Sequence, residues 1–210
     1  MTFSSSLSSN ERVLVLDASV LINLIGSGYC ERILAALTMP VKVSGYAATE
    51  ILNGGHYDAV VMQSLLDEGV IHREPLTPAA SILFADLVSG ATQESLGDGE
   101  AATIAIANDT GAIAVIDEKQ AWRIANNRFA DVQLATTVDI LALPSVRLSL
   151  GDSALAQAVN SSLVRARMQV REHQLDWVLG CIGVEAASAC RSLARLMRHR
   201  AHMARQRSCG

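Results

Sequence analysis

The chain has 210 residues, half of them hydrophobic and 18% charged, so it can form a folded core and is not disordered by composition. This length suits one compact domain with an appendage better than two full domains. Residues 1–150 hold 8 basic and 17 acidic groups, whereas residues 151–210 hold 9 basic and 4 acidic groups. The acidic part therefore has room for bound cations, and the basic part could attract a polyanion.

Neither a secretory signal nor a membrane span is predicted. The first ten residues are rich in serine rather than apolar, and no apolar run reaches the roughly 18 residues that a membrane helix needs. The four cysteines form no close C-x-x-C pair of the kind that suggests zinc or redox chemistry. We expect a cytoplasmic protein with a disordered leader over residues 1–10.

The first predicted element is a buried strand over residues 13–16, because this short run is β-branched and aliphatic. It ends at Asp17. Residues 19–24 and 31–37 have helical spacing, and the glycines at 26–28 separate them.

A second strand is expected over residues 41–44, followed by a helical segment over 47–52 that carries Glu50. Residues 70–71 are expected to form a small strand. Residues 78–87 favour a helix with Pro78 in its first turn.

The segment from residue 95 to residue 119 is the most informative part of the chain. Gly97 and Gly99 predict a turn, and residues 101–108 predict a helix that Gly111 ends. Residues 112–116 then favour another buried strand, which ends at Asp117.

The remaining pattern predicts a helix over 120–126, a last strand over 132–134 and a short helix over 137–143 that Pro144 stops. Long helical segments follow from residue 153. We therefore expect an α/β domain over residues 11–150 and a helical, basic C-terminal extension over residues 151–210.

Acidic residues stand where the predicted strands end. In open α/β sheets, ligands bind outside the carboxyl ends of the strands, so Asp17 and Asp117 should face one crevice. Glu100 and Glu50 could join them from neighbouring helices. Crowded carboxylates are tolerated mainly when a cation neutralises them, and oxygen ligands favour Mg²⁺ or Mn²⁺.

Structural explanations compete with this metal hypothesis. Asp17 and Asp117 could each cap the helix that follows, and Glu50 alone is an ordinary helical glutamate. Asp98 competes with Glu100 as the third ligand. A nucleotide-binding fold is a further alternative, but neither a P-loop nor a full G-x-G-x-x-G motif is present.

Four segments resemble the successive acidic motifs of the PIN (PilT N-terminus) domain family: VLVLDASVLINL, ATEIL, GDGEAATIAIA and AIAVIDEK. The resemblance covers about residues 13–140 and is closest to the uncharacterised, toxin-like branch. It implies a Rossmann-like, parallel-sheet α/β/α sandwich. Many members of the family are RNA endonucleases, including the toxins of VapBC-type toxin–antitoxin pairs.

Carried over by position, the resemblance implies that Asp17, Glu50, Glu100 and Asp117 are the catalytic metal ligands for Mg²⁺ or Mn²⁺. Ser19 matches a position that often holds a hydroxyl or amide and could orient a ligand. The implied activity is metal-dependent hydrolysis of RNA phosphodiester bonds, with an antitoxin protein or a homodimer as further expected partners.

Two departures from the family pattern stand out. The position before the last aspartate, where the family often has a hydroxyl residue, is Ile116, so one supporting hydrogen bond is in question. The extension from residue 153 also exceeds a minimal PIN domain. A catalytically silent PIN module that binds RNA or a protein therefore stays as the alternative.

The C-terminal extension carries a basic stripe. Arg191, Arg195 and Arg198 recur at helical spacing and fall on one face. A solvated face is the default interpretation, and contact with RNA phosphates is the functional hypothesis.

Overall fold

The structure is a computed structural model that describes residues 3–7, 12–90 and 95–208. Its described part contains a five-stranded, all-parallel sheet with the strand order β3-β2-β1-β4-β5. The strands are β1 (Leu14–Leu16), β2 (Val41–Ser44), β3 (His72–Glu74), β4 (Ile113–Val115) and β5 (Gln133–Ala135). β1 lies at the centre, where Leu14 pairs with Val41 of β2 and Ile113 of β4.

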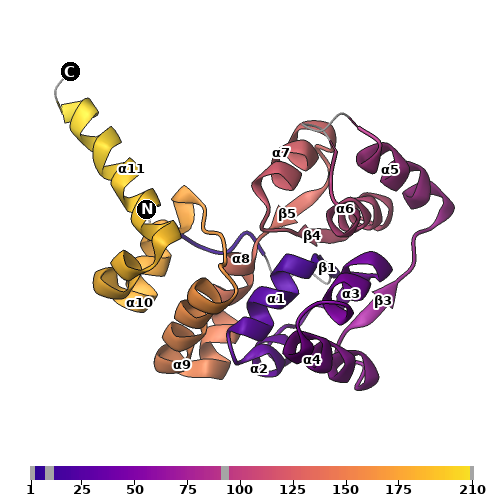
Figure 1. The fold of residues 1–210 in the computed structure, drawn as a ribbon, viewed down its shortest axis with the longest axis horizontal. Coiled ribbons are helices and arrows are strands. Elements are labelled where there is room, and N and C mark those ends of the chain that lie inside the picture. The colour runs from indigo at the N-terminus through magenta and orange to yellow at the C-terminus, as the bar shows by residue number, and fades with distance from the viewer. Residues whose placement is uncertain (1–2, 8–11, 91–94, 209–210) are drawn as a thin grey trace.

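Helices cover both faces of the sheet, as the short and wholly apolar central strands require. The helices that follow the strands are α1 (Ala18–Gly26), α2 (Cys30–Ala35), α3 (Gly45–Leu52), α4 (His56–Asp67), α5 (Pro78–Val88), α6 (Asp98–Thr110), α7 (Lys119–Arg128) and α8 (Thr137–Leu141). Figure 1 shows α5, α6 and α7 on one side of the sheet and α1 and α2 on the other. This arrangement is the expected α/β/α sandwich.

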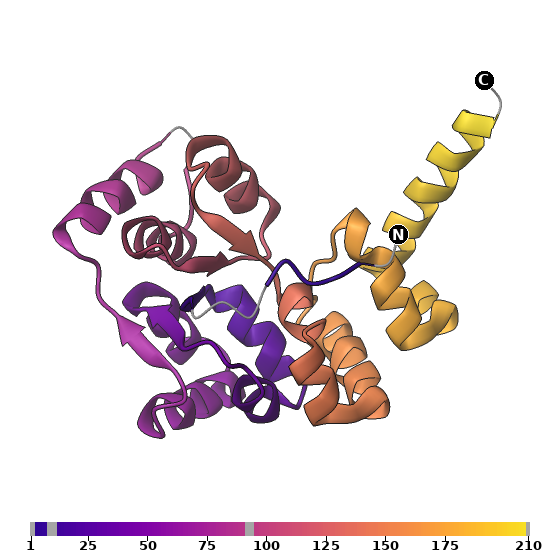
Figure 2. The same cartoon turned by 180° about the vertical axis from the view of Figure 1, so that it is seen from behind.

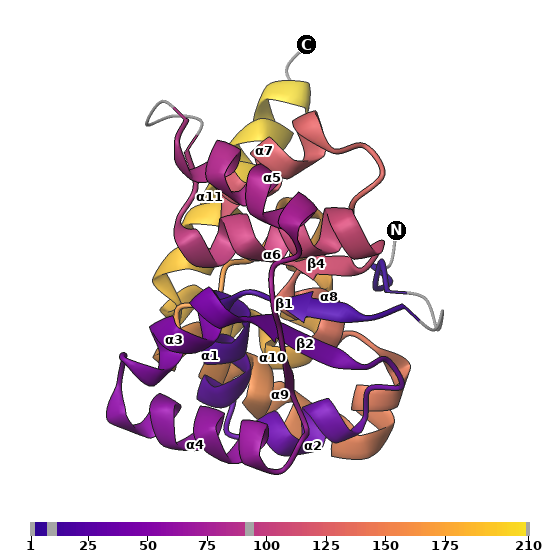
Figure 3. The ribbon, with the colours of Figure 1, turned by 90° about the vertical axis from the view of Figure 1, so that its right-hand side faces the viewer.

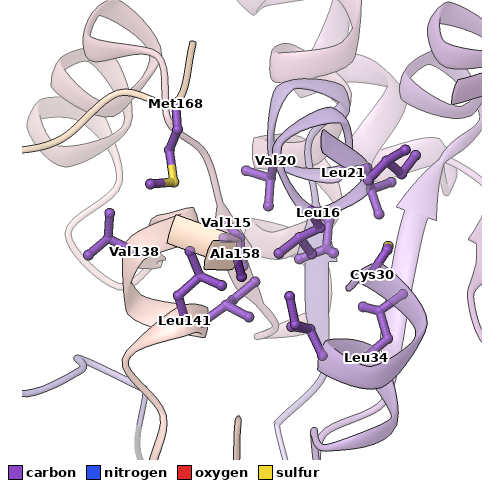
Figure 4. Packing of buried hydrophobic residues seen from close by; sticks show 14 of the residues in the cluster. Leu16, Val20, Leu21, Cys30, Leu34, Val115, Val138, Leu141, Ala158 and Met168 are labelled. Atoms are coloured by element: carbon purple, nitrogen blue, oxygen red, sulfur yellow. The ribbon is translucent and has the colours of Figure 1, made fainter. Parts of the chain in front are cut away.

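Successive side chains of a strand point to opposite faces of the sheet, so the core forms two clusters, one on each face. Leu14 and Leu16 pack into the cluster that includes α1 and α2, whereas Val15 packs into the cluster of α6 and α7. Figure 4 shows the first cluster, in which Leu16 and Val115 meet side chains of α1, α2 and α8.

The C-terminal part comprises α9 (Pro144–Arg165), a 3₁₀ turn η1 (Glu172–Gln174), α10 (Leu175–Ala189) and α11 (Arg191–Ser208). The helical path of α9 breaks at Gly151, whose φ of 73° suits glycine. The predicted domain boundary coincides with this break. Side chains on both sides of it, such as Val146 and Val159, nevertheless belong to one core cluster.

α10 and α11 lie to one side of the sandwich, and α11 projects away from it (Figures 1 and 2). Seen from the opposite side, they lie behind the sandwich (Figure 3). No helix in the described residues is both long and apolar enough for a membrane span.

Residues 3–7 fall within the leader that was expected to be disordered, but they instead lie against the domain (Figure 2). Leu7 is buried in the core, and Ser6 donates from its N and its Oγ to Asp139 Oδ1, both at 2.9 Å. Phe3 packs against His173 and Trp177. The rest of the predicted leader, residues 1–2 and 8–10, lies outside the described residues.

Four sequence-based expectations differ from the structure. β3 begins at His72 rather than Val70, and α4 was not predicted. α6 begins at Asp98, so the glycine-rich segment forms its first turn instead of a preceding loop. Pro144 occupies the first turn of α9, where its missing N–H costs nothing, so it begins that helix as well as following α8.

Candidate active site

Asp17 follows β1 directly and is held at the carboxyl edge of the sheet by α1. Its Oδ2 accepts hydrogen bonds from Ser19 Oγ at 2.6 Å and Ser19 N at 3.2 Å, so Asp17 caps the helix. The side chain is only 4% exposed. Burial raises the pKa of Asp17, the bonds from Ser19 oppose the rise, and repulsion from Glu118 adds to it.

Asp117 comes two residues after the end of β4, at the same edge of the sheet, and is 2% exposed. Its Oδ1 accepts from Thr137 N at 2.9 Å, and its Oδ2 accepts from Thr137 Oγ1 at 2.5 Å and from Asn23 Nδ2 at 2.6 Å. Burial raises the pKa of Asp117 to about 6 despite these bonds, and Asp17 contributes repulsion.

Ile116 is fully buried in the core beside α7, and it offers no hydrogen bond from its side chain. Thr137 and Asn23 supply polar support to Asp117 instead. The departure from the family pattern at Ile116 therefore does not leave Asp117 without a hydroxyl donor.

Glu100 lies in the first turn of α6, where its Oε2 accepts from Gly97 N at 3.3 Å. Burial raises the pKa of Glu100 to about 7, and repulsion from Asp17, Glu118 and Glu50 adds to this rise.

Glu50 is exposed on α3, and it faces Asp17 across Gly99. Burial and repulsion from Asp17 raise the pKa of Glu50. A Cβ placed on Gly99 would lie 3.2 Å from Glu50 Oε2 and 3.3 Å from Asp17 Oδ1. Only a residue without a side chain leaves the space between these two oxygens open.

Two further acidic residues flank this cluster. Asp98, the alternative ligand, is exposed and lines a cavity of about 680 Å³ together with Glu50 and Gly99. Glu118 is half-buried, caps α7 by accepting from Gln120 N at 3.2 Å, and accepts from Gln169 Nε2 at 2.9 Å.

The side chain of Arg171, in the segment before η1, reaches the edge of the acidic cluster. Arg171 Nη2 donates to the carbonyl oxygen of Asp117 at 3.1 Å, and its guanidinium lies 4.8 Å from the ring centroid of Trp122. Burial lowers the pKa of Arg171, while Asp117 and Glu118 oppose the change. Arg171 therefore offsets part of the negative charge.

The donor chemistry of Asp17, Glu50, Glu100 and Asp117 fits a hard divalent cation. As they stand, no three acidic, histidine or cysteine side chains of the described residues are arranged to hold a metal ion. The two aspartates are fixed by their hydrogen bonds, whereas Glu50 and Glu100 are longer and more exposed and can turn toward an ion. Asp17 Oδ1 and Glu50 Oε2 both lie beside Gly99, and an ion bound by both oxygens would relieve their repulsion.

Residues 13–162 match the profile of a protein family described as a PIN domain. The chain belongs to the PIN-domain family. A search of curated proteins finds no match to the chain. PIN domains are generally nucleases, and those nucleases typically use divalent metals.

The PIN domain thus brings together the four residues predicted from the sequence, with Ser19 bonded to Asp17. Arg195, in contrast, lines a separate cavity with Lys119 and Arg171, and Arg198 is exposed on α11. The side chain of Arg191 lies outside the part of the chain that the structure describes.

Three residues around the site were not predicted from the sequence: Asn23, Thr137 and Glu118. A signal for Asn23 was present, because it is the only strongly polar residue in the apolar run VLINLI, which predicts a helix buried on most sides. A buried amide needs a partner, and Asp117 provides it. Thr137 carried no comparable signal.

Proposed function

We propose that the chain is a metal-dependent endoribonuclease in which Asp17, Glu50, Glu100 and Asp117 hold Mg²⁺ or Mn²⁺. The main supporting observation is the convergence of these carboxylates at the carboxyl edge of the sheet, where Asp17 raises the pKa of the other three and Glu50 adds to the rise at Glu100. Such repulsion has no structural benefit for the metal-free protein, and it is relieved by a cation.

Hydrogen bonds set the orientation of the two aspartates before any ligand binds. Ser19 fixes Asp17 Oδ2 and leaves Oδ1 directed at the space beside Gly99. Thr137 and Asn23 fix both oxygens of Asp117. Ligands held in this way need little reordering on binding, which favours affinity.

The proposed hydrolysis needs no nucleophilic side chain. Burial raises the pKa of the Cys30 thiol to about 12, which keeps it protonated and unreactive at neutral pH. A bound divalent ion would supply an activated water for attack on the phosphodiester and would stabilise charge on the phosphoryl oxygens.

The direct test is cleavage of RNA by the full chain after removal of metal with EDTA. We expect no cleavage in EDTA and recovery with Mg²⁺ or Mn²⁺, because the carboxylates act through the ion. Asp17→Asn should abolish the recovered activity, whereas Asp131→Asn, at an exposed aspartate, should keep it. Full cleavage in EDTA by a preparation free of contaminating nuclease would contradict the proposal.

A further inference from the structure

An aromatic pair borders the acidic cluster. Tyr46, in the first turn of α3, stacks on Phe84 of α5 with ring centroids 4.6 Å apart and an interplanar angle of 25°. Tyr46 is nevertheless 42% exposed. Phe84 thus covers one face of the ring, while the residue as a whole keeps a large exposed surface.

Tyr46 lines the same cavity of about 680 Å³ as Glu50 and Gly99. It precedes Glu50 by four residues, which corresponds to one helical turn on the same face of α3. The cavity thus joins the aromatic ring to the carboxylates whose oxygens meet at Gly99.

A positively charged side chain also lines this cavity. Arg73, on the edge strand β3, is exposed and lines the cavity together with Tyr46 and Asn53. It pairs in register with Val43, next to the point where β2 leads into α3. The cavity therefore combines an aromatic ring, a guanidinium and carboxylates suited to a metal ion, and its volume is that of a small-molecule site.

The Tyr46 ring is held in place by its helical turn and by the ring of Phe84 behind it. Ser44 caps α3 by accepting from Ala47 N at 3.1 Å, which fixes the turn that carries Tyr46. Phe84 supports the ring from behind. A base that stacks on such a ring loses little affinity to the ordering of the protein.

We propose that Tyr46 is a base-stacking platform and Arg73 a phosphate contact for single-stranded RNA beside the scissile phosphate. Base–aromatic stacking tolerates any sequence but needs an unpaired base, since bases in a duplex are already stacked on each other. This inference rests on the proposed nuclease function for its choice of RNA.

The test measures binding rather than cleavage. The full chain carrying Asp17→Asn would be titrated, in Mg²⁺, into a fluorescent single-stranded RNA of roughly eight nucleotides. Two comparison ligands are an abasic ribose-phosphate oligomer of the same length and the RNA as a duplex. Fluorescence anisotropy gives each affinity.

We expect Tyr46→Ala to weaken binding of the single strand about tenfold, within the range of about 5- to 150-fold measured for lost stacking partners. Affinities for the abasic oligomer and the duplex should not change. Arg73→Gln should weaken binding of the single strand and the abasic oligomer alike and flatten their salt dependence.

Matched variants separate stacking from damage to the fold. Tyr46→Phe should keep the affinity, and Tyr46→Leu, which still covers Phe84, should lose it. Tyr57→Ala, at a tyrosine of α4 that is 66% exposed, should have no effect.

Equal loss for the base-bearing and abasic ligands, or no loss with Tyr46→Ala or with Tyr46→Leu, would overturn the inference. So would the absence of any RNA binding. If the Tyr46-dependent preference for bases is found but the chain with Asp17 intact fails to cleave RNA in Mg²⁺ or Mn²⁺, the result supports the platform and contradicts the nuclease proposal, so the two failures are distinguishable.

Discussion

Gly99 sets the spacing of two carboxylates at the candidate site. Alanine at this position would place a Cβ 3.2 Å from Glu50 Oε2 and 3.3 Å from Asp17 Oδ1, which is tight contact with both oxygens. Because alanine is also favoured over glycine in a helix by about 1 kcal/mol, the fold itself should not suffer.

Gly99→Ala is therefore expected to lower metal-dependent cleavage by about 10- to 100-fold while the melting temperature stays equal or rises. Cleavage assays and thermal melts on one preparation check both results. Gly97→Ala is the matched control in the same segment, since its nearest contact would be Glu100 Oε2 at an ordinary 3.7 Å. Unchanged activity in Gly99→Ala would show that the space is not used.

The raised carboxylate pKa values predict how the metal-free protein responds to pH. Asp117 has a pKa of about 6 against an ordinary 3.8, and Glu100 about 7 against 4.5. The folded state therefore holds these protons more tightly than the unfolded state. Their contribution to stability is fully present below the ordinary values and is lost as the pH rises through about 6 to 7.

In EDTA, the melting temperature should consequently fall between pH 5 and pH 8, and the fall should be smaller in Glu100→Gln. Saturating Mg²⁺ should remove most of it, because bound metal favours the charged carboxylates. Glu185→Gln, at an exposed glutamate of α10, is the control. A fall that is identical in Glu100→Gln would assign the pH dependence to other groups.

Asp17 and Asp117 could be found from the sequence because each ends a strand whose apolar run is visible by eye. Their hydrogen-bond partners are less accessible to such reasoning. Asn23 reaches Asp117 across 94 residues and Thr137 across 20, and these contacts depend on β1, β4 and β5 lying side by side. Local patterns do not determine such pairings.

At the scale of elements, sequence patterns located four of the five strands and misplaced the edge strand β3. β3 (His72–Glu74) is polar, and its charged residues are typical of an edge strand that avoids pairing with another chain. Lys42 and Glu74 form an ion pair of 2.5 Å across β2 and β3. α4 escaped prediction because only Met62 and Leu65 of its side chains are fully buried.

α1 packs closely against the residue that follows α9, and this contact can be tested by mutation. A Cβ on Gly26 would lie 2.9 Å from the Cβ of Ala166, and neither atom can move without its backbone. Gly26→Ala should lower the free energy of unfolding by about 1–3 kcal/mol, as overpacking of a core does.

Chemical denaturation of Gly26→Ala, Ala166→Gly and the double variant measures this contact. Removing the Ala166 methyl should restore most of the loss in the double variant, which gives a coupling that independent sites lack. Additive effects would mean that α1 and the segment after α9 do not meet as described.

For the whole molecule, charge is divided between an acidic α/β sandwich and a basic end. Arg195 and Arg198 are exposed on α11, and Arg195 lines a cavity of about 730 Å³ together with Lys119 and Arg171. Arg171 also contacts the carbonyl oxygen of Asp117, so this basic surface adjoins the acidic cluster. Under the proposed function, this surface is a candidate contact for the phosphates of RNA bound at the acidic cluster.

Replacing Arg195 and Arg198 by Gln should weaken RNA binding similarly for all sequences and lower the salt slope by about 0.7 for each lost phosphate contact, because fewer counterions are released. Arg200→Gln is the control on the same helix, since Arg200 is paired with Asp176 at 2.5 Å. Anisotropy titrations at several salt concentrations measure both quantities. If affinity and slope are unaltered but the double variant loses self-association in analytical ultracentrifugation, α11 is a surface for a second copy of the chain, and RNA is held by the sandwich alone.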